Sequence, residues 1–140
     1  MKKKRIKHII DELNKTDEHF HLEVKKGSKV GKSVLETICA FANEPGLGGG
    51  TIVLGVAEDK SVPLPNYKIV GVEDADKIQK DVASQCASSF NQSIRPIITV
   101  EHIDGKNVVL IDVDEVCPQS KPIYFNNLGL PRGAYRRIGS

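Results

Sequence analysis

Apolar residues recur at two spacings along the chain, and these spacings predict its central helix and strand. Residues 33–43 carry an apolar face at helical spacing, and a Pro-Gly step follows them. Ser33 with Glu36 three positions later matches a capping box, which predicts that the helix begins at Ser33. Three glycines then lead into an apolar, β-branched run at 51–56, which is typical of a buried strand.

The same two spacings predict the other elements. An amphipathic helix is expected over residues 4–15, and Asp74 or Asp76 caps a helix that ends near Asn91. Strands are expected at 19–25, 67–72, 97–103, 107–114, 123–125 and 133–138. Asp104-Gly105 is a strong hairpin signal. The predicted class is α+β, with a mixed β-sheet of about five to six strands, two main helices and the N-terminal helix.

Length and composition limit the organisation of the chain. At 140 residues one domain is expected, made of the basic amphipathic helix at 1–15 and a domain at 16–140. Because the sequence stops just after a structured-looking segment, we expect this domain to be cut from a longer protein. No apolar run approaches the roughly 20 residues that span a bilayer, and the N-terminus lacks a signal-peptide core. We therefore expect a cytoplasmic protein without membrane contact.

Three cysteines, Cys39, Cys86 and Cys117, are widely spaced and odd in number. This pattern indicates small core residues rather than disulfides or a zinc site.

Basic residues are clustered, although the net charge of +2 is too small by itself to imply a nucleic-acid partner. If the clusters converge on one face, they would contact phosphates; otherwise each is a solvated surface stretch. The candidate phosphate-binding residues are Lys25, Lys26, Lys29, Lys32, Arg132, Arg136 and Arg137. Aromatic residues make up only 5% of the chain, so backbone contacts are expected in place of a broad stacking platform.

Two glycine-containing stretches suggest phosphate loops, but neither has the required pattern. The stretch 27–33, GSKVGKS, has three residues between its first glycine and its Gly-Lys pair, whereas a nucleoside-triphosphate loop has four. The glycines at 46–50 precede a strand, so they lack the helix N-terminus that attracts anions. We interpret the first as a basic loop and the second as a tight turn.

Four acids, Glu18, Glu23, Glu58 and Asp59, form a candidate metal-binding set. If the strand of the 20s pairs beside that of the 50s, Glu23 would approach Glu58 or Asp59. Two or three carboxylates with Lys25 nearby suit a Mg²⁺- or Mn²⁺-dependent phosphodiesterase. Ordinary surface acids are the alternative interpretation.

Several motifs in a fixed order resemble the Schlafen-type, Alba-related DNA-binding domain. These are EHFHLEVK at 18–25, AFAN at 40–43, GGTIVLGV at 49–56, KPIY at 121–124 and YRRIGS at 135–140. The resemblance covers nearly all of the chain after residue 16. It implies a compact α+β domain that binds DNA or RNA.

The resemblance also implies what the surrounding protein and the acids do. In bacteria such domains begin transcriptional regulators or helicase-related proteins, in some of which an ATPase-like, ATP-binding region follows. Animal Schlafen relatives cleave RNA with a metal-bound trio of acids, whose first two members would be Glu18 and Glu23. The third would be Glu58, although an Asp is usual there and the register across 57–59 is open.

These observations and the resemblance lead to three alternative hypotheses of function. The first is a nucleic-acid-binding domain of a transcriptional regulator that recognises backbone phosphates. The second is a metal-dependent Schlafen-like endoribonuclease with Glu18, Glu23 and Glu58 as catalytic residues. The third is a non-catalytic interaction domain that forms a homodimer.

Overall fold

The computed structural model describes residues 5–15, 21–26, 30–64 and 66–136 of the chain. The helices in these ranges are α1 (Arg5–Lys15), α2 (Lys32–Asn43) and α3 (Ala75–Ser88), with a short 3₁₀ helix at Pro118–Ser120. The strands are β1 (Leu22–Lys25), β2 (Gly50–Leu54), β3 (Val56–Glu58), β4 (Tyr67–Ile69), β5 (Ile97–Ile103) and β6 (Lys106–Val113).

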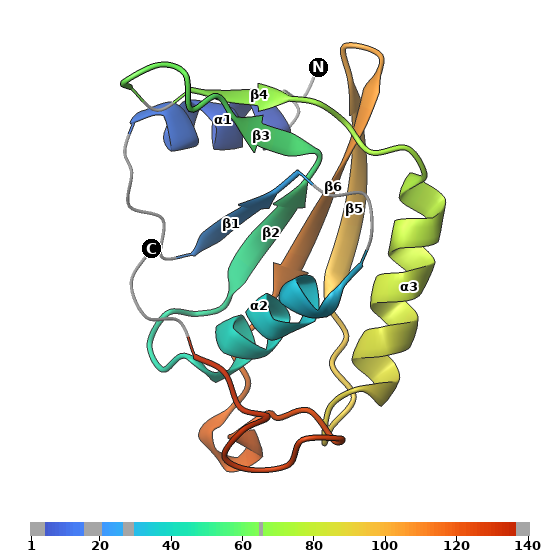
Figure 1. The fold of residues 1–140 in the computed structure, drawn as a ribbon. Helices are drawn as coiled ribbons and strands as arrows, with labels where there is room; N and C mark the ends of the chain where they lie inside the picture. Colours follow the sequence, from blue (N-terminus) through green and yellow to red (C-terminus); the bar gives the residue numbers. More distant parts are fainter. Residues whose placement is uncertain (1–4, 16–20, 27–29, 65, 137–140) are drawn as a thin grey trace.

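The strands form a four-stranded sheet in the order β1-β2-β6-β5 and a two-stranded sheet of β3 and β4 (Figure 1). β1 runs parallel to β2, and the other neighbouring strands are antiparallel. The sheet is therefore mixed, and the α+β prediction with three helices is confirmed. The expected pairing of the 20s strand with the 50s strand is also present, with Glu23 opposite Ile52.

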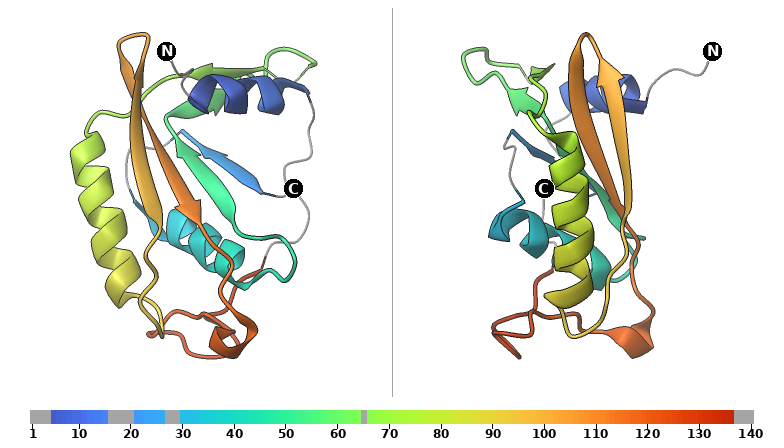
Figure 2. Two further views of the ribbon diagram at one scale, coloured as in Figure 1. Left: turned by 180° about the vertical axis from the view of Figure 1, so that it is seen from behind. Right: turned by 90° about the vertical axis from the view of Figure 1, so that its right-hand side faces the viewer.

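Two apolar cores lie on the two faces of the four-stranded sheet. α2 and α3 cover one face and α1 lies on the other, as the views in Figure 2 show. Side chains alternate along β2, so Ile52 and Leu54 enter the first core and Val53 enters the second. The β-branched run predicted as a buried strand is buried for this reason, because both of its faces are covered.

The run predicted as one strand over 51–56 is split into β2 and β3. Gly55 separates the two strands and has a φ of 102°, which a side-chain-bearing residue rarely adopts. Its N–H donates to the Lys25 carbonyl at 3.0 Å, and its carbonyl accepts from Val70 and Gly71. The chain thus leaves the large sheet at Gly55 and enters the small one.

Local signals predicted several elements correctly. Asp74 caps α3 through a hydrogen bond from the Lys77 N–H at 3.1 Å. β5 and β6 form the expected hairpin, with Asp104 and Gly105 both at positive φ. In the strands predicted at 123–125 and 133–138, the described residues form only isolated bridges, between Tyr124 and Ala134 and between Phe125 and Phe90, and positions 137 and 138 lie outside the described residues.

α1 is fixed to the sheet by its first two residues. The Glu101 carboxylate on β5 accepts hydrogen bonds from the N–H groups of Arg5 and Ile6, at 3.2 and 2.8 Å. The Arg5 guanidinium forms two 2.7 Å bonds to Asp112 on β6. Buried Ile6, Ile9 and Leu13 complete the contact. The helix is part of the folded domain in this structure.

The cysteine prediction is correct for two residues and wrong for the third. Cys39 and Cys86 are buried and unbridged, and burial raises the pKa of each thiol to about 11. Cys117 is exposed, since it precedes the surface 3₁₀ helix rather than lying on a core-facing element.

Candidate nucleic-acid interface

The connection from β1 to α2 brings basic side chains to the N-terminus of a helix. β1 and β2 are parallel, and α2 is the crossover between them. Such a crossover places the first turn of its helix near the carboxyl end of the first strand. Lys25, the last residue of β1, accordingly donates a 2.7 Å hydrogen bond from Nζ to Ser33 Oγ in the first turn of α2.

The first turn of α2 differs from the predicted capping box. The helix begins at Lys32 rather than Ser33, and its N-cap is Gly31, which has no side chain that could cap it. Ser33 is not the cap because its hydroxyl lies inside the first turn and accepts the Lys25 bond. Glu36 instead pairs with Lys32, four positions earlier, at 3.8 Å. A helix N-terminus with a glycine N-cap and the Lys25 and Lys32 side chains at its first turn favours anions.

We refer to Lys25, Lys26 and Lys32 as the β1–α2 lysine cluster. Lys26 is exposed beyond the end of β1, and the Lys32 side chain is 71% exposed. Both ammonium groups are therefore available to a ligand. Lys29 was predicted to belong to the same group but lies outside the described residues.

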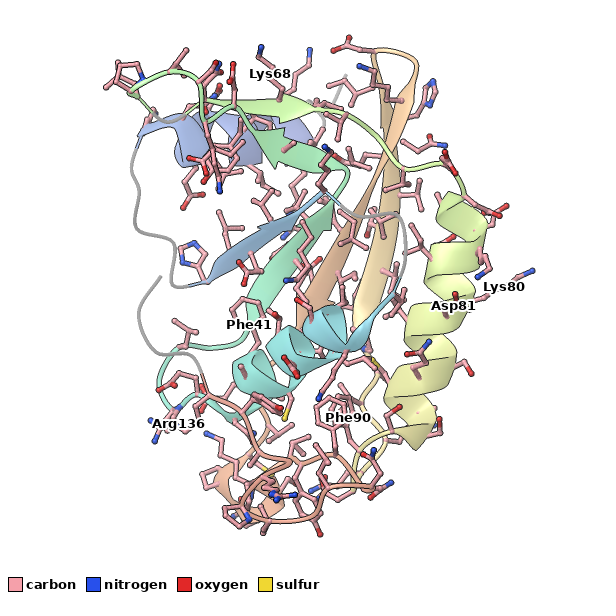
Figure 3. All side chains as sticks on the ribbon, viewed as in Figure 1. Phe41, Lys68, Lys80, Asp81, Phe90 and Arg136 are labelled. Atoms are coloured by element: carbon pink, nitrogen blue, oxygen red, sulfur yellow. The ribbon has the colours of Figure 1, made fainter. Side chains whose placement is uncertain are left out.

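The C-terminal arginines lie at the other end of α2. Arg136 pairs with Glu44, the C-cap of α2, at 3.0 Å, and this hydrogen bond raises the arginine pKa. Figure 3 shows Arg136 at this end of the helix. A twelve-residue helix is about 18 Å long, so Arg136 and Lys32 are separated by roughly that distance. Arg132 is exposed.

The two described basic groups therefore do not form one compact patch. The lysines lie at the N-terminus of α2, where Lys32 and Glu36 are 3.8 Å apart, whereas Arg136 forms a 3.0 Å hydrogen-bonded pair with Glu44. Arg137 lies outside the described residues. The stronger candidate for phosphate contact is the β1–α2 lysine cluster.

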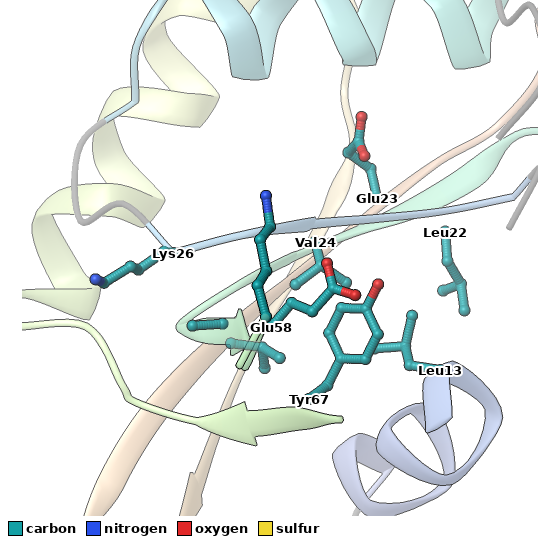
Figure 4. A pocket seen from close by; sticks show the side chains of 10 residues that line it. Leu13, Leu22, Glu23, Val24, Lys26, Glu58 and Tyr67 are labelled. Atoms are coloured by element: carbon teal, nitrogen blue, oxygen red, sulfur yellow. The ribbon is translucent and has the colours of Figure 1, made fainter. Parts of the chain in front are cut away.

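The candidate acids Glu23 and Glu58 line one pocket of about 480 Å³ between α1, β1, β3 and β4 (Figure 4). Leu22 and Val24 belong to the core on the α1 side, so Glu23 between them is on the α2 face of β1. Glu58 lies two positions after the buried Val56 on β3, so its side chain is on the same face of this strand, toward the core on the α1 side. In Figure 4 the two carboxylates point to different sides of β1.

Asp59 has other partners. Its carboxylate accepts hydrogen bonds from the N–H and hydroxyl of Ser61, at 3.0 and 2.5 Å, and lies 3.5 Å from Lys68. These bonds to Ser61, more than the charge of Lys68, lower the pKa of Asp59. The carboxylate therefore stabilises the turn after β3.

The described acids do not make a metal-binding set. Over residues 5–15, 21–26, 30–64 and 66–136, no group of three or more His, Cys, Asp or Glu side chains is close enough to hold a metal ion. Glu18 lies outside these ranges. The metal-bound trio with Glu18 and Glu23 stays a prediction.

Two residues of the Glu58 pocket were not singled out from the sequence. Lys60, two positions after Glu58, adds a second lysine to the pocket lining, which also includes Lys26. Tyr67 on β4 supplies an aromatic ring, and its N–H donates to Asn14 of α1 at 2.7 Å. The sequence alone shows only a lysine in a loop and a tyrosine at the start of a strand. Neither indicates a binding site until β3 is known to pair with β4.

The fold and these motifs define the class of protein. The family described as Schlafen, AlbA_2 matches residues 18–140, and the chain belongs to this family. Its fold resembles the solution NMR structure of the N-terminal domain of a protein from Nitrosomonas europaea, which is named as related to the ATP-dependent DNA helicase RecG. That domain is 47% identical, with a TM-score of 0.80 over 99% of this chain and 91% of that one.

A second solved structure, the DIP2311 protein from Corynebacterium diphtheriae, is 20% identical with a TM-score of 0.47. The similarity covers 76% of this chain and 19% of that one. No match was found among curated proteins. Within the described residues, no helix is both long and apolar enough to cross a bilayer.

Proposed function

We propose that the domain binds nucleic acid by receiving backbone phosphates on the β1–α2 lysine cluster. The observation that carries the proposal is the 2.7 Å bond from Lys25 to Ser33 beside the uncapped N-terminus of α2. Lys25 is thereby held where the helix dipole already favours negative charge. A phosphate here would receive hydrogen bonds from ammonium groups and from backbone N–H groups.

The family and the Nitrosomonas europaea relative support a nucleic-acid partner, and we propose DNA as the first to test. Contacts of this kind read the backbone rather than the bases, so affinity should depend weakly on sequence and strongly on salt. The domain would then act as the attachment module of a regulator, as the resemblance implies.

The experiment compares two double variants by fluorescence anisotropy with a labelled DNA over a series of salt concentrations. Lys26→Ala/Lys32→Ala removes two cations of the cluster. Lys77→Ala/Lys80→Ala is the matched control on α3, where Lys77 also has an i,i+4 acidic partner and a similar exposure of 69%. Figure 3 shows Lys80 on the outer side of α3.

The cluster variant should lose affinity, and the slope of log K against log salt should fall by about one per lysine. The α3 variant should behave like the wild type. A wild type with a flat salt response, or equal losses in both variants, would contradict the proposal.

A metal-dependent ribonuclease is the second candidate function, favoured by the presence of Glu23 and Glu58 in one pocket with Lys26 and Lys60. Cleavage of a labelled RNA in Mn²⁺ would be lost in Glu23→Gln while nucleic-acid binding is retained. Equal cleavage by the wild type and by Glu23→Gln would remove this candidate.

A further inference from the structure

We propose that the pocket between α1, β1, β3 and β4 receives one unpaired guanine base of a bound strand. The inference rests on the proposed function and makes it more specific, because it names a single-stranded partner and a preferred base. It uses Glu58 as a hydrogen-bond acceptor for the base and requires no metal ion.

The floor of the pocket is apolar and built from buried side chains. It includes Leu13 and Val56, both fully buried, and Leu22, which is 5% exposed. Val24 and the ring of Tyr67 line the same space (Figure 4). At about 480 Å³ the pocket falls in the size range of small-molecule sites. Flat apolar and aromatic walls suit a base, which stacks on such groups when it leaves its own strand.

Of the two carboxylates that line the pocket, that of Glu58 lies on the side of β1 that carries Val24 and Tyr67 (Figure 4). Glu58 is exposed at the end of β3, and within the described part of the chain it forms no ion pair. A carboxylate accepts two hydrogen bonds side by side. Guanine presents two adjacent N–H donors, N1–H and the N2 amino group, on its pairing edge. Uracil, thymine, adenine and cytosine lack this pair of neighbouring donors, so Glu58 selects guanine.

The rim of the pocket is basic, and β1, the edge strand of the large sheet, separates it from the proposed phosphate site. Lys26 and Lys60 both line the pocket. Lys26 adjoins Lys25, whose ammonium group lies at the start of α2. A strand whose phosphates contact Lys25 and Lys26 would pass around this edge and carry a base to the mouth of the pocket. A base in a duplex is stacked and paired, so entry selects a single strand or an unpaired position.

The test measures the affinity of oligothymidylate ten-mers that contain one central guanine, one central inosine, one abasic site or no change. Inosine lacks the N2 amino group but keeps N1–H. A duplex that contains the same guanine is the fifth ligand. We expect the guanine strand to bind about ten-fold more tightly than the abasic strand, with the inosine strand between them and the duplex weaker.

Two matched variants separate the roles of neighbouring carboxylates. Glu58→Gln should reduce the preference for guanine to two-fold or less, because an amide has one acceptor atom and presents N–H groups of its own. Asp59→Asn removes the same charge one residue later, where the carboxylate binds Ser61 outside the pocket, and should keep the preference. Circular dichroism of both variants verifies that they are folded.

The outcomes distinguish the two proposals. If the strands bind with the expected salt dependence but without preference for guanine, the base pocket is refuted and the phosphate site remains. The same conclusion follows if Asp59→Asn abolishes the preference as strongly as Glu58→Gln. If no strand binds in a salt-dependent manner, the proposed function itself fails.

Discussion

The side-chain amide of Asn43 and the backbone of Ile123 form a two-way hydrogen bond across 80 residues of chain. The Ile123 N–H donates to Asn43 Oδ1 at 2.7 Å, and Asn43 Nδ2 donates to the Ile123 carbonyl at 2.9 Å. The same nitrogen donates to the Tyr135 carbonyl at 2.9 Å. One buried side chain at the end of α2 thereby holds two parts of the C-terminal segment.

Replacing this amide should be costly. Asn43→Ala leaves the buried Ile123 N–H without its partner and removes one hydrogen bond from each of the Ile123 and Tyr135 carbonyls, so we expect a loss of about 2–4 kcal/mol in the free energy of unfolding. Urea denaturation measures it. The matched control is Asn127→Ala, at an exposed position, which should change the free energy by less than about 0.5 kcal/mol. Equal effects of the two substitutions would contradict this account.

Gly31→Asp should change stability and nucleic-acid affinity in opposite directions. Gly31 is the N-cap of α2 in an extended conformation. Apart from its two chain neighbours, no atom of the described residues lies within 4 Å of the place that a Cβ would occupy, so an aspartate fits and can cap the helix. This substitution should stabilise the protein by a few tenths of a kcal/mol. The added negative charge beside Lys25 and Lys32 should weaken DNA binding. Gly31→Ser is the control, because it supplies the cap without adding a charge. If Gly31→Ser lost as much DNA affinity as Gly31→Asp, the added charge would not be the cause of the loss.

Asp112 should contribute to the acid sensitivity of the fold. Its hydrogen bonds from Arg5, with a further one from Thr51, hold its pKa below the ordinary value despite partial burial. A depressed folded-state pKa gives stability that is present above the unfolded value, about 3.9, and is lost as the pH falls through the folded one. Asp112→Asn should therefore lower stability at pH 7 by up to about 1 kcal/mol and flatten its dependence on pH below about 4.

Thermal melts from pH 7 to pH 2 measure this effect. Asp81→Asn, which breaks an exposed pair with Lys77, is the control and should leave the profile close to that of the wild type. An unchanged acid profile in Asp112→Asn would show that the Arg5 contact does not set this dependence.

One thiol should react much faster than the other two in the folded protein. Cys117 is exposed, and a hydrogen bond with Ser120 lowers its pKa, which increases its thiolate fraction near neutral pH. Cys39 and Cys86 are buried, and desolvation raises their pKa values to about 11. A thiol reagent that gives a coloured product should show one fast equivalent, which Cys117→Ser removes. Two or three fast equivalents in the wild type would contradict this expectation.

The sequence predicted elements whose signals are local. The α3 cap at Asp74, the hairpin turn at Asp104-Gly105 and the helix in the first fifteen residues all depend on spacings within one element. The break at Gly55 was missed because an apolar run looks the same whether it stays in one sheet or crosses to another. Its positive φ is imposed by contacts with Lys25 and Gly71, which are distant in sequence.

The candidate site was predictable in part for the same reason. Lys25, Lys26 and Lys32 form a visible cluster in the sequence, but the bond from Lys25 to Ser33 depends on the parallel pairing of β1 with β2. Lys60 and Tyr67 join the pocket only through the pairing of β3 with β4. Arg136 lay in a basic run, and nothing local indicated that Glu44 would neutralise it.

The attachment of α1 by Glu101 and Asp112 has a practical consequence for anyone who shortens this chain. Ile6 and Leu13 are fully buried in the second core, where Val53 and Leu110 also lie. Deleting the first fifteen residues would therefore expose the apolar face of the sheet that α1 covers. Such a fragment should aggregate or bind an apolar helix of another protein through this face. It would also lose Leu13, which lines the pocket between α1, β1, β3 and β4.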